Sequence, residues 1–182
     1  MYKSFLELDV EKSGALTPPQ FARFGDGLTS LFAERVFEAH VLGRRKERPA
    51  EMDFDAFLDF VLAWTHRSHP VALSYFYRVL DVHAGSGLTR AELALFFGSV
   101  HEEWLATSPA YDVPVSDVVS EIMDLLRGDG AEASRVSLRD FTRCGNGGTV
   151  VGLLASVEEF VTYDGREQAL FVQAESGSPP RG

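Results

Sequence analysis

The sequence holds one cysteine among 182 residues, so no disulfide can form within the chain. Such sparing use of cysteine is typical of proteins in a reducing compartment. Basic residues are also few, with 17 Lys and Arg against 27 Asp and Glu, and the formal net charge at pH 7 is −10. Nucleic-acid-binding surfaces gather Lys and Arg against the phosphates, so we expect no nucleic-acid partner. The acidity fits calcium-binding ancestry, a basic partner surface or solubility alone.

Long hydrophobic runs are missing too. No stretch approaches the ~18–20 apolar residues that cross a bilayer, and residues 1–10 are acidic and amphipathic, unlike a secretory signal. We therefore expect a soluble cytoplasmic protein without a membrane span. Material for a core is ample, because hydrophobic residues make up 45% of the chain and Phe occurs 14 times.

A short motif occurs four times along the chain. An apolar residue is followed by a small polar residue, and a second apolar residue comes four positions later. The four copies begin at Leu16, Met52, Leu88 and Val136. Their starts lie 36, 36 and 48 residues apart, and a recurrence on this scale indicates one supersecondary unit used several times.

The first copy identifies the unit. Asp9 opens a twelve-residue loop that carries oxygen-bearing side chains at positions 3, 5 and 9, which are Glu11, Ser13 and Thr17. Gly14 stands at position 6, where an EF-hand calcium loop makes its sharp turn, and Leu16 at position 8 is where two such loops pair. Because only about two helical turns precede this loop, we expect the chain to be part of a longer protein.

The predicted fold is all-α, with two paired EF-hand lobes built from four helix–loop–helix units and short β stubs between paired loops. Apolar residues at helical spacing support this interpretation, and no segment longer than a few residues alternates with period 2. We place the first pair at 1–68, the second pair with a C-terminal helix at 69–172, and a disordered tail at 173–182.

Several element boundaries follow from local signals. We expect one helix over about 28–42, a helix capped by Ser116, a flexible connector at 144–148 (CGNGG) and a last helix over about 149–160. Thr17, Pro18 and Gln20 predict a helix start, with Gln20 closing a capping box onto Thr17.

Calcium needs six to eight oxygens, including a bidentate carboxylate at loop position 12. The candidate ligands of the first loop are Asp9, Glu11, Ser13, the Ala15 carbonyl and, at position 12, Gln20. An amide cannot supply the charged bidentate clamp, so we expect weak or absent calcium binding there.

The other three loops are poorer still. The second, Arg45–Ala56, lacks both essential carboxylates. The third has Asp81 and Glu92 at its ends but His83 and Gly85 at positions 3 and 5. The fourth has Asp129 and Asp140 at its ends with Ala131 and Ala133 between them. We expect these three loops not to bind calcium.

No catalytic constellation emerges from the remaining residues. Cys144 beside a glycine-rich turn suggests a phosphate loop, but a tyrosine-phosphatase loop needs Arg where Val150 stands and a Walker loop needs Lys where Thr149 stands. The five His residues show no metal-ligand spacing. We therefore expect no enzymatic activity, and the alternative of an enzyme built around Cys144 is disfavoured.

Longer strings carry a more specific resemblance. They are LFAERVFEAHV (31–41), MDFDAFLDFVLA (52–63), ALSYFYRVLDV (72–82), PVSDVVSEIMDLL (114–126) and GGTVVGLLASVEEFVTYDGRE (147–167). In order and spacing the chain resembles the C-terminal EF-hand region of the B''-type regulatory subunits of protein phosphatase 2A. Among the subgroups, the chain most resembles the gamma type, which includes the plant Fass/Tonneau type tied to cortical microtubule organisation.

This resemblance implies a non-catalytic targeting subunit that binds the phosphatase scaffold and catalytic subunits and directs substrate choice. It also implies a cytoplasmic location, with the cytoskeleton or centrosome as a further site of association. By position, the family's calcium-binding first loop corresponds to Asp9, Glu11, Ser13, Ala15 and Gln20, and Gln20 departs from the family's acidic residue. The alternative is a stand-alone EF-hand calcium sensor or buffer, which three Met residues and Gln20 disfavour.

Overall fold

The computed structural model describes residues 1–41, 51–85, 87–107, 113–127 and 135–165. Helices dominate, and the strands are two-residue stubs that form two separate antiparallel pairs. Leu16 pairs with Met52, and Leu88 pairs with Val136. Both predicted stub pairs are thus confirmed, and the four units associate two by two. Among the described residues, no helix is long and apolar enough to cross a membrane.

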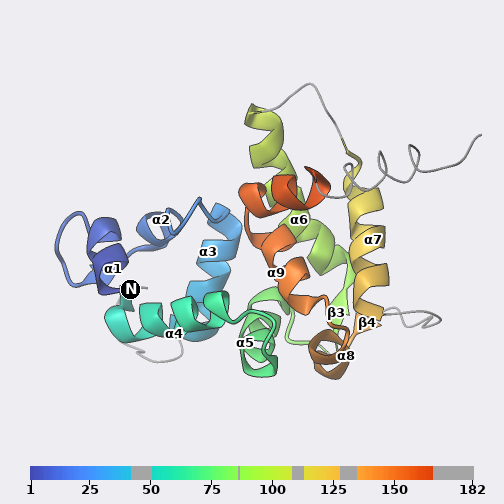
Figure 1. The fold of residues 1–182 in the computed structure, drawn as a ribbon, viewed down its shortest axis with the longest axis horizontal. Helices are drawn as coiled ribbons and strands as arrows, with labels where there is room; N and C mark the ends of the chain where they lie inside the picture. Colours follow the sequence, from blue (N-terminus) through green and yellow to red (C-terminus); the bar gives the residue numbers. More distant parts are fainter. Residues whose placement is uncertain (42–50, 86, 108–112, 128–134, 166–182) are drawn as a thin grey trace, which may run out of the picture.

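The first pair of units occupies one half of the molecule (Figure 1). Its first unit comprises α1 (Tyr2–Leu8), β1 (Ala15–Leu16) and α2 (Pro18–Phe21). Its second unit comprises α3 (Ser30–Val36), a π-helical turn η1 (Phe37–Val41), β2 (Met52–Asp53) and α4 (Phe54–Thr65). The predicted helix over about 28–42 is confirmed over Ser30–Val41, and its last described turn is π-helical.

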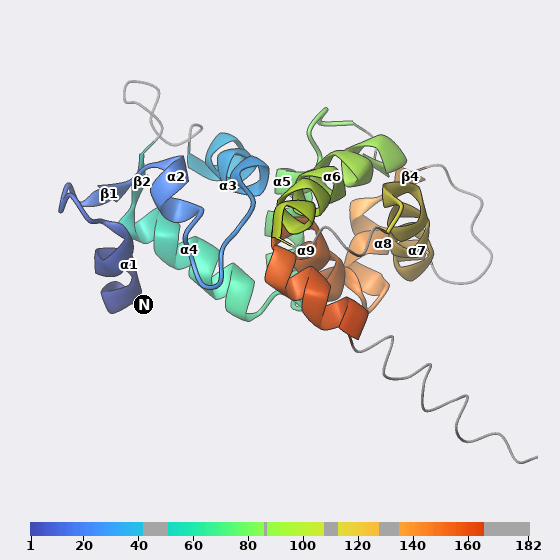
Figure 2. The same ribbon diagram turned by 90° about the horizontal axis from the view of Figure 1, so that it is seen from above.

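The second pair lies beside the first in both views (Figures 1 and 2). The third unit of the chain comprises α5 (Pro70–Leu80), β3 (Leu88–Thr89) and α6 (Arg90–Thr107). Its fourth comprises α7 (Val115–Arg127), β4 (Arg135–Val136) and α8 (Leu138–Arg143), and α9 (Gly147–Ala155) packs against this pair. A further helical segment spans 157–165.

The small polar residue of the recurring motif caps each helix that leaves a loop. Asp53 accepts a hydrogen bond from the backbone N–H of Ala56 at 3.0 Å, and Ser137 Oγ accepts one from the N–H of Asp140 at 3.2 Å. Thr17 and Thr89 stand at the same place before α2 and α6. The motif thus encodes a stub, a helix cap and the first core residue of the next helix.

Aromatic side chains join the two pairs into one core. The buried hydrophobic residues form one cluster that takes members from both pairs. Phe32 of α3 is fully buried, and its ring centroid lies 6.3 Å from that of Phe76 on α5 and 6.2 Å from that of Phe96 on α6. Trp64 at the end of α4 packs against Phe32 and Phe76 as well.

Polar contacts reinforce the junction. The N–H of Thr29 donates to the carbonyl of Ala155 at 2.8 Å, and Arg67 pairs with Glu159 at 2.6 Å. The Arg67 guanidinium also lies 4.9 Å from the centroid of the Trp64 ring. The boundary expected near residue 68 falls in the linker between α4, which ends at Thr65, and α5, which begins at Pro70. The division into 1–68, 69–172 and 173–182 stays a prediction, and 173–182 lies outside the described residues.

Three local predictions are wrong. Gly147 and Gly148, expected in a flexible connector, are buried at the start of α9, where they allow close approach to Leu73 and to Ser68. The helix expected over 149–160 is interrupted at extended Ser156. Helix α7 begins at Val115, so Ser116 lies within its first turn and bonds to Asp117 rather than capping.

Candidate calcium-binding loops

Loop 1 runs from Asp9 to Gln20 and is organised around the Asp9 carboxylate, which is only 2% exposed. Its Oδ1 accepts the N–H of Ser13 at 2.9 Å, and its Oδ2 accepts the N–H of Gly14 at 2.8 Å. Burial would raise the pKa of Asp9, but these backbone hydrogen bonds outweigh it and hold the pKa below its usual value. Lys12 and Gly14 take positive φ angles of 54° and 80° to make the turn.

Gln20 turns its amide oxygen toward the start of α2 instead of into the loop. Its Oε1 accepts the backbone N–H of Thr17 at 2.8 Å and the Thr17 hydroxyl at 3.1 Å. The capping box expected from the sequence is therefore present. Ser13 Oγ in turn donates to the Ala15 carbonyl at 2.8 Å.

These bonds decide how well loop 1 fits calcium. Of the five predicted ligands, only Asp9 and Glu11 carry charge, and Glu11 is exposed. The oxygen atoms of the other candidate ligands already take part in hydrogen bonds within the chain. Asp9 and Gln20 accept backbone N–H groups, and the Ser13 hydroxyl donates to the Ala15 carbonyl. In the part of the chain that the structure describes, no group of three or more His, Cys, Asp or Glu side chains is placed to hold a metal ion. The donor set does not fit a high-affinity calcium site.

Loop 3, from Asp81 to Glu92, is closed by a different carboxylate. Glu92 is 2% exposed, and its Oε2 accepts the N–H of Thr89 at 2.9 Å and the Thr89 hydroxyl at 2.8 Å. Its Oε1 faces the backbone N–H of His83 at 3.2 Å and the ring Nδ1 of His83 at 3.1 Å. Burial would raise the pKa of Glu92, but the bonds from Thr89 and His83 lower it below its usual value.

Thr89 and Glu92 have the spacing of a capping box, which the sequence predicts and the structure confirms. Sequence reasoning missed the contact of Glu92 with His83, nine residues earlier, because that contact depends on the path of the loop. Asp81 contributes as well, because its Oδ1 accepts the N–H of Gly85 at 2.9 Å.

The described part of loop 4 follows the same scheme. Asp140 Oδ2 accepts the N–H of Ser137 at 3.2 Å and the hydroxyl of Ser137 at 2.5 Å, and these bonds lower the pKa of Asp140. Residues 45–50 of loop 2, Ser86 of loop 3 and residues 129–134 of loop 4 lie outside the described residues. Position 12 thus serves as a helix cap in loops 1, 3 and 4.

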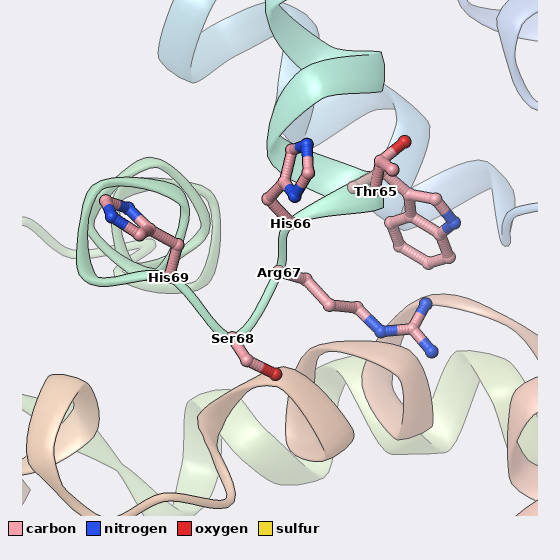
Figure 3. A pocket seen from close by; sticks show the side chains of 6 residues that line it. Thr65, His66, Arg67, Ser68 and His69 are labelled. Atoms are coloured by element: carbon pink, nitrogen blue, oxygen red, sulfur yellow. The ribbon is translucent and has the colours of Figure 1, made fainter.

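The remaining candidate residues have structural places. Cys144 is half-buried at the end of α8, and its thiol donates to the Phe141 carbonyl at 3.4 Å. A shallow cleft of about 590 Å³ is lined by residues 64–69, at the end of α4 and in the linker to α5. Figure 3 shows His66, Arg67 and His69 pointing away from one another along this linker. They converge on no common point, so the cleft has no metal-ligand or acid–base arrangement.

No model of a known protein family matches the chain. Individual proteins do match. TON2 from Arabidopsis thaliana, described as a probable B'' regulatory protein of serine/threonine-protein phosphatase 2A, is 39% identical over 171 residues, which cover 91% of this chain and 35% of the relative. The gamma-type B'' regulatory protein of the same phosphatase from Xenopus tropicalis is 32% identical over 99% of this chain and 38% of the relative. Its human counterpart is 30% identical over 98% of this chain and 38% of the relative.

A solved structure shows the same fold. One chain of a structure described as a PP2A PR70 holoenzyme superposes with a TM-score of 0.75 at 22% identity, covering 88% of this chain and 58% of that one. The predicted all-α fold of EF-hand type is confirmed. The chain spans a little over a third of the length of the curated relatives it matches. Over that region, this chain is a homologue of the B''-type regulatory subunits of protein phosphatase 2A.

Proposed function

We propose that this chain acts as a non-catalytic regulatory part of protein phosphatase 2A, binding the scaffold and catalytic subunits and directing the choice of substrate. One observation carries the proposal: identity of 30–39% with B''-type regulatory subunits extends over 91–99% of the chain. Because it runs through both EF-hand pairs, it concerns a whole structural body and not an isolated loop.

The fold suits a docking role. Phe32 and the Arg67–Glu159 pair hold the two EF-hand pairs against each other, so a partner meets surfaces in a fixed relative position. Exposed apolar side chains are available on the first pair, including Tyr2 and Leu6, and on the second, including Val71 and Leu138. Hydrophobic side chains of this kind commonly anchor protein interfaces.

We further propose that calcium plays a minor part. Loop 1 would bind calcium through Asp9, Glu11, Ser13, Ala15 and Gln20. Its dissociation constant would exceed the roughly 10⁻⁷–10⁻⁵ M of calcium-sensor loops. The alternative function, a stand-alone calcium sensor, needs calcium to open an apolar groove. The internal hydrogen bonds of loops 1 and 3 disfavour it, because they favour a closed geometry that does not depend on the ion. The proposed location is the cytoplasm, and association with the cytoskeleton or centrosome belongs to the same proposal.

The test is a binding experiment with purified scaffold and catalytic subunits of protein phosphatase 2A. The tagged chain is immobilised, and capture of the two subunits is measured with about 1 mM calcium, well above the range of sensor loops, and with a chelator. We expect capture of the scaffold–catalytic pair in both arms, with less than a roughly threefold difference between them. Circular dichroism at the same temperature verifies that the chain is folded.

Two results would contradict the proposal. A folded chain that captures neither subunit removes the regulatory function. Capture only with calcium, together with calcium-dependent exposure of hydrophobic surface to a fluorescent dye, favours the calcium sensor.

A further inference from the structure

Loop 3 has a feature that an ion-binding EF loop does not need. In a calcium-filled loop, the position-12 carboxylate gives both oxygens to the ion. Here the carboxylate of Glu92 is buried, and each oxygen already faces two donor groups of the chain. Oε2 accepts the N–H and the hydroxyl of Thr89, and Oε1 faces the N–H and the ring Nδ1 of His83. Four donors saturate a carboxylate, so no oxygen of Glu92 is left for an ion.

His83 stands at position 3, where a calcium loop has a ligand side chain. Its imidazole Nδ1 instead lies 3.1 Å from Glu92 Oε1 and its backbone N–H lies 3.2 Å from the same atom. Because that oxygen belongs to a carboxylate, the Nδ1 atom carries the proton and donates. The position-3 side chain therefore contacts the position-12 carboxylate directly, an arrangement that calcium would have to break.

Position 5 is blocked in another way. Gly85 has no side chain, and a Cβ built on it would lie 3.2 Å from Nη1 of Arg135 on β4. The Arg135 guanidinium thus lies where a position-5 ligand would begin. A positive charge at this place repels a divalent cation.

A second arginine reaches the start of loop 3 from the other EF-hand pair. Arg35 of α3 donates from Nε to the carbonyl of Val79 at 3.1 Å and from Nη2 to the carbonyl of Asp81 at 3.3 Å. These are carbonyls at the C-terminal end of α5, where a cation is stabilising. Arg35 also pairs with Glu38 on its own side of the junction. Loop 3 is therefore anchored at its first residue by the chain itself.

We infer that loop 3 is an ion-independent EF loop, in which His83 closes the loop onto Glu92 in place of a calcium ion and Arg135 occupies the place of the position-5 ligand. Loop 3 holds its shape in the absence of calcium and excludes the ion. His83 is a positioning residue for this closure. The inference concerns one loop and stands independently of the proposed phosphatase function.

The first experiment restores the ligands. A variant with His83→Asp, Gly85→Asp, Ser86→Gly and Arg135→Ser supplies acidic side chains at positions 3 and 5, glycine at position 6 and no competing arginine. The full chain also carries Glu11→Gln to weaken loop 1. By titration calorimetry we expect no calcium isotherm up to about 1 mM for Glu11→Gln alone and binding below about 10⁻⁴ M for the restored loop.

A matched control keeps His83 while making the other three changes in loop 3. We expect it to bind calcium at least roughly tenfold more weakly than the fully restored loop. Equal affinity would overturn the role of His83, and no binding by the fully restored loop would overturn the assignment of His83 and Arg135 as the excluding groups. An isotherm for Glu11→Gln alone that disappears on adding Glu92→Gln would overturn the inference altogether.

The second experiment tests closure without calcium. In chelator, His83→Ala removes the side-chain donor and should lower the Tm by about 2–4 °C. His83→Gln retains an N–H donor and should recover at least half of that loss. Both variants also carry Glu11→Gln to weaken loop 1, and calcium at about 1 mM should leave their Tm values unchanged within about 1 °C, since loop 3 offers no site to shift them by binding. A His83→Ala variant as stable as the parent, or one rescued by calcium, contradicts the assignment.

Discussion

Replacing Gly147 by Ala should destabilise the protein, although alanine is the better helix former. Gly147 is the buried first residue of α9. A Cβ at this position would lie 2.8 Å from the backbone oxygen of Phe141 and 2.8 Å from Cδ2 of Leu73. Both separations are shorter than a normal contact, and one involves backbone that cannot rotate away. Helix α9 therefore has to move away from α8 and α5.

The magnitude follows from overpacking, which costs about 1–3 kcal/mol in a well-packed core. For a chain of this length, about 1 kcal/mol corresponds to a Tm change of about 2–4 °C, so a cost near 2 kcal/mol lowers the Tm by roughly 4–8 °C. The matched control is Gly98→Ala within α6, where a Cβ meets no atom within 4 Å. That change should stabilise by about 0.5–1 kcal/mol, because alanine is favoured in a helix interior.

Scanning calorimetry and urea unfolding measure the change in stability of each variant, which is expected to be negative for Gly147→Ala and positive for Gly98→Ala. Both start from glycine and both add one methyl group to a helix, so the chemical change is matched. If Gly147→Ala is as stable as the parent, or gains stability like Gly98→Ala, then α9 does not pack as closely as the geometry indicates. A flexible connector at 144–148 would then be the better description.

Three further outcomes are expected. The pKa of Glu92 lies below its ordinary 4.5 in the folded state, so its stabilising contribution is complete above pH ~4.5 and lost as pH falls through the folded pKa. Glu92→Gln should therefore flatten the acid side of a stability–pH curve from urea unfolding, and an unchanged curve would contradict this. Phe32→Ala should lower the free energy of unfolding by about 3–5 kcal/mol, and two separate calorimetric transitions in the parent would contradict a shared core. Arg67→Met and Glu159→Gln should couple by roughly 0.5–1 kcal/mol in a double-mutant cycle, since the pair is partly exposed; zero coupling would refute the ion pair.

The recurring motif made the fold predictable from sequence. Apolar Leu16 and Met52 pair across the stubs, and Thr17 and Ser137 cap the following helices, as the spacing implied. Each cap depends on residues within a few positions of one another, and each stub pair follows from the repeat itself. Local rules therefore locate the units, the caps and the paired loops.

The wrong predictions concern residues whose structure depends on contacts with distant parts of the chain. Glycines at 147 and 148 are weak helix formers, and the chain-local signal favours a connector. They are buried at the start of a helix, where Leu73 and Ser68, more than seventy residues earlier, approach too closely for any side chain. Similarly, the contact of His83 with Glu92 needs the three-dimensional path of the loop. Packing between distant segments overrides propensity at these places.

Internal closure of the loops has a consequence for regulation. In a calcium sensor, the ion changes the angle between the helices of a unit because it pulls the position-12 carboxylate toward the loop. In loops 1 and 3, Gln20 and Glu92 are already bonded to Thr17 and Thr89 at the start of the following helix, and Phe32 wedges the two pairs together. A ligand shifts an equilibrium only through differential binding to two states. If loops 1 and 3 bind calcium as weakly as proposed, calcium changes the surface offered to a partner little, and calcium control would then come from another segment or another protein.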